Sequence, residues 1–270
     1  MKRLALFLAA ITASLTIVAV APAQTGDATL DGDTHPNVGA LLWKRPSDGS
    51  ITILCSGTLV SPKVFLTAGH CADYLLSNGQ TEAYVTFDPD FGTDATRGYK
   101  VFSTPFKGRV INNPDYKAPY QNDTAIVLLP EPVTGIAPAQ LAPLGLLDQL
   151  KKSRAIYDTE FTNVGYGTAE QVVVPTQGPV FPFDGIRKWT ISGFHALNPE
   201  AVHLNQNLHQ GNSGTGYGDS GGPTFVDTTN GPVIVSVVST GDIPCWATSV
   251  NQRVDIANAQ TFLEPYLALT

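Results

Sequence analysis

The sequence predicts an all-β protein, a barrel or sandwich in two strand-rich halves with one helix at the C-terminus. Short runs of β-type residues recur along the 270-residue chain, and Gly, Pro, Asn and Asp separate them. The chain has 25 Gly and 20 Pro, a turn-rich composition. Only the last stretch, residues 256–267, places its apolar residues near helical spacing. This length allows one large or two small domains with ample core.

The first residues have the pattern of a secretory signal. Lys2 and Arg3 precede an uncharged apolar run from Leu4 to Val20, and Ala21-Pro22-Ala23 has small residues where signal peptidase reads. This pattern predicts a signal peptide over residues 1–23, cleaved after Ala23. A membrane anchor is the alternative, but the apolar run is barely long enough to span a bilayer. We expect a secreted, extracellular protein with no membrane attachment after cleavage.

The remaining chain divides into four segments. Residues 24–34 are small and polar, which predicts a flexible leader or propeptide. Residues 35–140 contain the predicted strands Val38–Trp43, Gly57–Val60, Val64–Thr67, Ala83–Phe87, Val101–Ser103 and Ala125–Leu129. After a proline-rich crossing, residues 141–254 contain Phe161–Val164, Val172–Val174, Lys188–Ile191, Thr224–Val226, Val233–Ser239 and Val250–Val254. In residues 255–270, Asp255 is expected to cap a helix over Ile256–Leu267.

Residues 55–71 predict a compact hairpin, and a sharp turn follows at Ala68–Cys71. Export permits disulfides, and a bond between Cys55 and Cys71 would staple this hairpin beside His70. Closing a loop of about 15 residues is worth ~3 kcal/mol in the entropic description. The chain has three cysteines, so one thiol is left over.

Three short motifs in the chain resemble those of a known protein family. Residues 66–71 (Leu-Thr-Ala-Gly-His-Cys), 122–129 (Asn-Asp-Thr-Ala-Ile-Val-Leu-Leu) and 218–223 (Gly-Asp-Ser-Gly-Gly-Pro) resemble the histidine, aspartate and serine motifs of the chymotrypsin/trypsin-like serine proteases. The order His70, Asp123, Ser220 is also that of this family. The resemblance covers roughly residues 35–268. It implies two six-stranded antiparallel β-barrels with the active site between them, His70 and Asp123 on the first and Ser220 on the second.

The resemblance also implies the catalytic roles. Ser220 would be the nucleophile, His70 its base and Asp123 the residue that orients the histidine, with the N–H groups of Gly218 and Ser220 as the oxyanion hole. Each residue also has an ordinary interpretation: Asp123 as a turn aspartate before a strand, Ser220 as part of a glycine-rich loop. The remaining histidines lie in no recognisable motif and are expected to be ordinary polar residues: His35, His195, His203 and His209.

By the same resemblance, Gly214 would floor the pocket for the P1 side chain, with Ser249 near its wall. The strand that pairs with the substrate backbone would contain Ser239, Thr240 and Gly241. No acidic residue stands at the floor, which favours a neutral or apolar P1 residue. Asp242 is the competing feature, because a carboxylate turned inward would favour a basic P1 residue.

The chain departs from the family at three places. Gly216 stands where many relatives have a cysteine, which leaves Cys245 unpaired. No Ile-Val-Gly-Gly-like sequence lies between Gln24 and Pro36, so the partner of Asp219 stays open between another cation and hydrogen bonds. Asp88–Asp94 matches a calcium loop of some relatives, but a solvated acidic turn is expected there, and we expect no metal and no cofactor.

The leading function is therefore a secreted serine endopeptidase that forms an acyl-enzyme. The alternatives are a catalytically silent homologue that binds proteins and a serine esterase with the same triad. The net charge of −7 argues against nucleic-acid partners, which need clustered Lys and Arg. We expect a monomer that acts on protein or peptide substrates.

Overall fold

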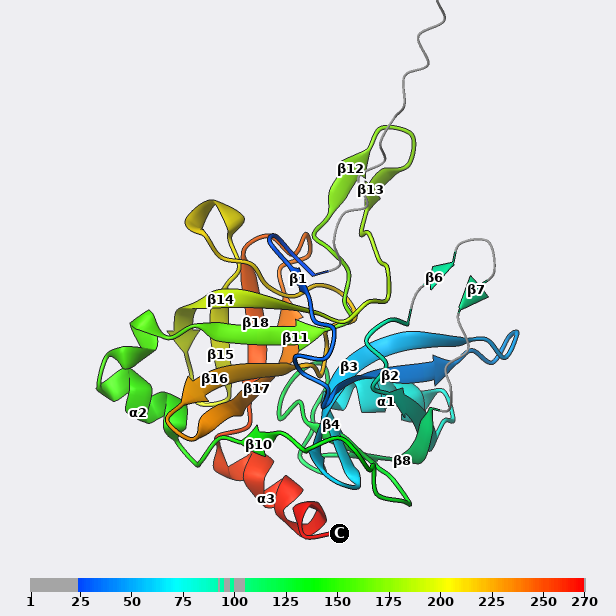
Figure 1. Ribbon diagram of the computed structural model, residues 1–270, viewed down its shortest axis with the longest axis horizontal. Coiled ribbons are helices and arrows are strands. Elements are labelled where there is room, and N and C mark those ends of the chain that lie inside the picture. Colours follow the sequence, from blue (N-terminus) through cyan, green and yellow to red (C-terminus); the bar gives the residue numbers. More distant parts are fainter. Residues whose placement is uncertain (1–23, 92, 95–97, 100–104, 270) are drawn as a thin grey trace, which may run out of the picture.

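The chain folds into two closed six-stranded antiparallel β-barrels that lie side by side (Figure 1), as the sequence predicts. The computed structural model describes residues 24–91, 93–94, 98–99 and 105–269. The predicted signal peptide (residues 1–23) and the predicted strand Val101–Ser103 lie outside these residues. Gly92 and the side chains of Thr93 and Asp94 also lie outside them, so the acidic turn over Asp88–Asp94 stays a prediction.

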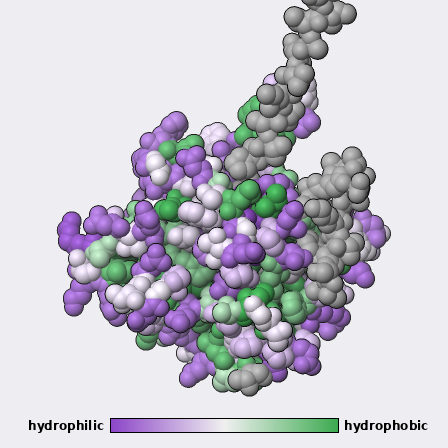
Figure 2. Space-filling model, in the orientation of Figure 1, coloured by the Kyte–Doolittle hydropathy of each residue, from purple (hydrophilic) through white to green (hydrophobic). Residues whose placement is uncertain are grey.

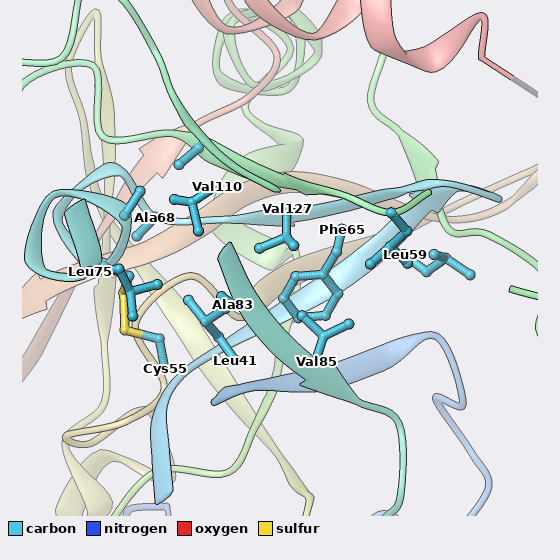
Figure 3. Packing of buried hydrophobic residues seen from close by; sticks show 14 of the residues in the cluster. Leu41, Cys55, Leu59, Phe65, Ala68, Leu75, Ala83, Val85, Val110 and Val127 are labelled. Atoms are coloured by element: carbon cyan, nitrogen blue, oxygen red, sulfur yellow. A yellow bond between two sulfur atoms is a disulfide. The ribbon is translucent and has the colours of Figure 1, made fainter. Parts of the chain in front are cut away.

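The first barrel closes where its first strand pairs with a later one, β2 with β5. Around the barrel the strands are β2 (Val38–Lys44), β3 (Ile51–Ser61), β4 (Val64–Thr67), β9 (Ala125–Leu128), β8 (Phe106–Asn112) and β5 (Glu82–Thr86). Leu41, Leu59, Phe65 and Val127 fill the interior together with Leu75 of helix α1 (Gly69–Ser77) (Figure 3). The core therefore fixes α1 at the end of β4.

The second barrel closes through the pairing of β14 with β15. Its strands are, in order, β14 (Lys188–Leu197), β11 (Phe161–Gly165), β16 (Pro223–Thr228), β17 (Gly231–Gly241), β18 (Thr248–Arg253) and β15 (Ala201–Asn205). Helix α2 (Leu146–Lys152) and a 3-10 turn (Ala155–Asp158) cover one end of it, while the short strand β10 (Gln140–Leu141) runs parallel to β17.

Smaller elements lie outside the barrels. The hairpin of β12 (Val172–Val174) and β13 (Gly178–Val180) projects away from the second barrel (Figure 1). The other short elements are β6 (Thr93–Asp94), β7 (Gly98–Tyr99) and a 3-10 turn at Leu208–Gln210. Hydrophilic side chains cover much of the face in Figure 2, with small hydrophobic groups between them. Among the described residues, no helix has both the length and the apolar character needed to cross a membrane.

A third apolar cluster joins the two barrels. Val38 and Leu66 of the first barrel pack with Val164 and Val237 of the second. Helix α3 (Ala257–Leu267) adds Phe262 and Leu263 to the same cluster. The two barrels are therefore packed directly on each other, and the loops at their junction are held at short range.

Two local expectations about helices are wrong. The segment after β4 is not a sharp turn, because α1 begins at Gly69 and His70 lies in its first turn. Helix α3 begins at Ala257 without a side-chain cap, so Asp255 does not cap it. Asp255 instead accepts hydrogen bonds from Arg253 Nε and from the backbone N–H of Leu147, both at 2.8 Å. Arg253 is only 2% exposed, and a buried guanidinium needs a carboxylate.

Residues 24–34 pack against the second barrel, where a flexible leader or propeptide was expected. Strand β1 (Thr29–Leu30) pairs with β14, and Asp31 lies 2.7 Å from Arg187 Nε and 2.5 Å from His35 Nδ1. Arg187 is fully buried and also donates to the carbonyl of Val38. Burial alone would raise the pKa of Asp31, but the hydrogen bonds from His35 and Arg187, with the charge of Arg187, lower it.

Candidate active site

His70 and Asp123 are brought together by strand pairing. Thr67 at the end of β4 is opposite Ala125 at the start of β9, so the residues just beyond the two strands meet. His70 Nδ1 lies 2.8 Å from Asp123 Oδ2, and the backbone N–H of His70 donates to Oδ1 at 2.7 Å. Because Nδ1 faces a carboxylate, the proton belongs on Nδ1 and leaves Nε2 free to act as a base.

Asp123 is fully buried, and residues of the second barrel complete its hydrogen bonds. Ser239 Oγ donates to Asp123 Oδ2 at 2.5 Å, and Gln252 Oε1 accepts from the Asp123 N–H at 2.9 Å. Gly69 leaves the space that this cluster needs, since a Cβ there would lie 2.7 Å from the Tyr116 ring. The imidazole is therefore oriented by a carboxylate that both barrels hold in place.

The loop that carries Ser220 is bound to the first barrel through Ser56 of β3. The Ser56 N–H donates to the Ser220 carbonyl at 2.8 Å, and Ser56 Oγ donates to the Gly218 carbonyl at 2.9 Å. Gly221 has φ +79°, and a Cβ on it would lie 2.2 Å from Thr67 Oγ1, so only glycine fits this approach. Neither the Gly218 N–H nor the Ser220 N–H donates to any group in the described part of the chain. Both are available to an incoming oxygen.

His70 and Ser220 line one cleft of about 390 Å³. The predicted disulfide Cys55–Cys71 is confirmed and connects β3 to α1. His70 Nε2 lies 3.5 Å from Cys71 Sγ, so the crosslink is beside the catalytic candidate. Both sulfurs of the Cys55–His70–Cys71 group are in the disulfide and offer no thiolate to a metal. Tyr120 packs edge-on to the His70 ring and also lines the cleft, a contact that no motif indicated.

One wall of the cleft is polar and uncharged. Thr215 lines it, and Thr215 Oγ1 lies 2.9 Å from Ser249 Oγ. Gly214 lies behind this wall, where a Cβ would meet Gln206 Oε1 at 2.3 Å. Gln206 is 3% exposed, lines the cleft and accepts from the Thr215 N–H at 3.0 Å. Because residue 214 is a glycine, the carboxamide of Gln206, which follows β15, has room to lie beside it.

The opposite wall contains Ser239, Thr240, Gly241 and Asp242. The carboxylate of Asp242 accepts three backbone N–H groups of its own loop, from Trp246 at 2.9 Å, Ala247 at 3.0 Å and Thr248 at 2.6 Å. These three hydrogen bonds hold the carboxylate against its own loop. Cys245 is buried with a free thiol, and burial followed by the nearby charge of Asp242 raises its pKa to about 12. The thiol is therefore protonated at neutral pH and a poor nucleophile.

Asp219 lies directly beside the candidate nucleophile and is fully buried. Its Oδ1 accepts from the Gly167 N–H at 2.8 Å and from Gln24 Nε2 at 3.1 Å, and its Oδ2 accepts from the Gly216 N–H at 2.8 Å. Burial raises its pKa to about 6 in spite of these hydrogen bonds. The residue between Gly218 and Ser220 is thus held by hydrogen-bond donors and not by a contacting cation within the described chain.

This two-barrel fold, with a histidine, a buried aspartate and a serine at the barrel junction, defines the class of trypsin-like serine proteases. The sequence model of the trypsin family matches residues 26–260. The chain therefore belongs to the trypsin family, whose members are serine endopeptidases that act on protein and peptide substrates. A search among curated proteins gave no match.

Proposed function

We propose that this protein hydrolyses peptide bonds with Ser220 as nucleophile, His70 as general base and Asp123 as the residue that orients His70. One observation carries the proposal: His70 bridges the buried carboxylate of Asp123 and the cleft that Ser220 also lines. The free N–H groups of Gly218 and Ser220 support their assignment as the oxyanion hole.

The reaction then runs in two halves. Ser220 Oγ attacks the scissile carbonyl carbon while His70 Nε2 takes the hydroxyl proton. The oxyanion accepts hydrogen bonds from Gly218 and Ser220, and Asp123 stabilises the imidazolium. His70 returns the proton to the leaving amine, which leaves an acyl group on Ser220. Water, deprotonated by His70, attacks the acyl carbon; the bond to Ser220 Oγ then breaks, His70 returns the proton to Ser220, and the acid is released.

For the P1 residue we propose a neutral or apolar preference. The lining near Thr215 and Ser249 is polar but uncharged, and Gln206 adds a carboxamide. Asp242 is bound to its own loop by three backbone donors, which argues against pairing with Arg or Lys. Such a pairing needs a carboxylate that is desolvated in the pocket.

We further propose that the protein works outside the cell, as a monomer, on protein or peptide substrates and without a cofactor. The signal pattern over residues 1–23 and the Cys55–Cys71 disulfide both support an oxidising compartment.

Digestion of a denatured protein mixture, with the cleavage sites read by mass spectrometry, tests activity and P1 preference together. We expect cleavage after neutral or apolar residues that is absent with Ser220→Ala. Preferred cleavage after Arg or Lys would contradict the pocket assignment. Fluorophosphonate labelling without protein cleavage would favour the esterase, and neither labelling nor cleavage would favour the silent homologue.

A further inference from the structure

We propose that Gln24 is a positioning residue for catalysis, whose side-chain carboxamide holds Asp219 and thereby the loop of Gly218 and Ser220 in its active shape. We further propose that Gln24 does so as the first residue of the mature chain. This inference rests on the proposed function. It assigns to a residue of the expected leader a place in the machinery of the second barrel, about 195 positions away in the sequence.

The contact between Gln24 and Asp219 is buried. Gln24 and Asp219 are both 0% exposed, and Gln24 Nε2 donates to Asp219 Oδ1 at 3.1 Å. The carboxamide oxygen of Gln24, Oε1, has no partner among the described residues, so the side chain makes its hydrogen bond to Asp219 alone. In the described chain, Gln24 is the one side chain that donates to this carboxylate, because its remaining donors are backbone N–H groups.

The carboxylate has no room to turn to another partner. A Cβ on Gly165 or Gly167 would lie 2.2 Å from an Asp219 oxygen, so the glycines of the neighbouring segment enclose it. The charge of Lys188 in β14 also acts on this carboxylate, but the Lys188 ammonium pairs with Asp184. Cys245 and Glu170 also lie near this site: the first is a protonated thiol, and the second accepts the Gly26 N–H. Losing the carboxamide would therefore leave a buried charge short of a donor.

Asp219 connects this contact to the chemistry. Its carboxylate accepts the Gly216 N–H, and its carbonyl accepts the Gly222 N–H at 2.8 Å, so both ends of the serine loop are bound to it. Gly218 has φ +100° within this loop, a conformation that glycine reaches without strain, so the bonds around the loop decide where its N–H points. A displaced Asp219 would turn the N–H groups of Gly218 and Ser220 away from the oxyanion.

The predicted signal-peptide cleavage site lies directly before Gln24, the residue that makes this contact. A cut after Ala23 leaves Gln24 first in the chain, with its backbone nitrogen 3.3 Å from the Gly167 carbonyl and 3.1 Å from the Thr168 carbonyl. Those two acceptors would hold the new ammonium where the amide N–H now lies. Removal of the signal peptide would then leave this contact in place, and no second cut would be needed.

The test compares kcat/KM of Gln24→Glu, Gln24→Met and the neighbouring control Thr25→Val, each as the secreted protein, at about pH 8 and about pH 6. Thr25 is also buried, but its hydroxyl has no partner in the described chain, so Thr25→Val should equal wild type at both pH values. Gln24→Glu places two carboxylates together and should lose about 100-fold at the higher pH, the loss typical of a displaced oxyanion donor.

At the lower pH the ratio of Gln24→Glu to wild type should recover about tenfold, because a shared proton restores the donor. A role in folding alone would not produce that recovery. Gln24→Met, which keeps the volume, should lose activity while its thermal unfolding stays cooperative. Equal activity of wild type and both Gln24 variants would overturn the proposal, whereas an inactive wild type would overturn the proposed function instead.

N-terminal analysis of the active secreted protein tests the second half of the proposal. We expect an intact Gln24 as the first residue. An active enzyme trimmed beyond Gln24, or one whose Gln24 has cyclised to pyroglutamate and lost Nε2, would contradict the assignment.

Discussion

Ser239→Ala removes a single hydrogen bond from the carboxylate that orients His70. Ser239 Oγ donates to Asp123 Oδ2 at 2.5 Å, and Asp123 is fully buried, so solvent does not replace the lost donor directly. Hydrogen bonds to charged groups contribute about 1.5–3 kcal/mol. If this bond is needed to hold Asp123 against the imidazolium, kcat/KM should fall by roughly 10- to 100-fold.

The loss should appear in kcat more than in KM, because the imidazolium forms only as the reaction proceeds. Steady-state kinetics on a peptide amide substrate measure both constants. Ser236→Ala is the matched control on the same strand, β17, because Ser236 is buried and its hydroxyl has no partner in the described chain. Ser239→Ala with kcat within about twofold of wild type would refute the orienting role of this bond.

Three further predictions follow from the structure. Gln206→Glu keeps an acceptor for the Thr215 N–H and adds a negative charge to the cleft lining. Cleavage after Arg or Lys should therefore appear in a panel of peptides that vary at P1. An unchanged cleavage profile would show that Gln206 does not face the P1 side chain. Asp31→Asn should cost about 3–5 kcal/mol in urea unfolding at neutral pH, because it leaves Arg187 buried without its carboxylate. Folding lowers the pKa of Asp31, so the stabilisation by its carboxylate is present above the ordinary pKa of 3.8 and is lost as the pH falls below that value. The stability difference between wild type and Asp31→Asn should therefore shrink at low pH. A difference that stays constant with pH would contradict the ion pair. Thiol titration of the unfolded protein should find one free cysteine per chain, Cys245, and finding none would mean that Cys245 pairs between molecules.

The motif residues could be predicted because their surroundings are local in sequence. His70 is adjacent to the crosslinked Cys71, Asp123 lies two residues before the start of β9, and Gly218 and Gly221 flank Ser220 at positive φ. Each short string therefore contains both the functional group and the backbone geometry that presents it. The alternation of short strands with turn residues likewise predicted the two halves of the fold.

The groups that hold these residues could not be predicted, because they come from remote segments. Ser56 binds the serine loop from β3, and Gln206 reaches the cleft from the segment after β15. Neither residue lies in a pattern that distinguishes it from other polar residues in a strand-rich chain. The contact between Gly214 and the distant Gln206 at the cleft becomes visible only when the backbone is closed into a barrel.

The burial of residues in the expected leader, residues 24–34, could not be predicted either. Residues 24–34 are small and polar, a composition typical of flexible segments, yet Asp31 and Gln24 are buried. Their side chains bind partners that are remote in the sequence, Arg187 and Asp219, which local composition does not reveal. The helix at Gly69 was missed for a related reason, since its Ala72 and Leu75 are held by the core of the first barrel and not by a strong helical pattern.

Labelling with a fluorophosphonate, followed by peptide mapping, tests the central claim most directly. We predict one phosphonyl adduct per chain, on Ser220, formed at the same pH at which the protein cleaves an unfolded protein, and lost together with that cleavage in Ser220→Ala. Protein cleavage that survives in purified Ser220→Ala, or an adduct on a residue other than Ser220, would contradict the assignment of Ser220 as the nucleophile.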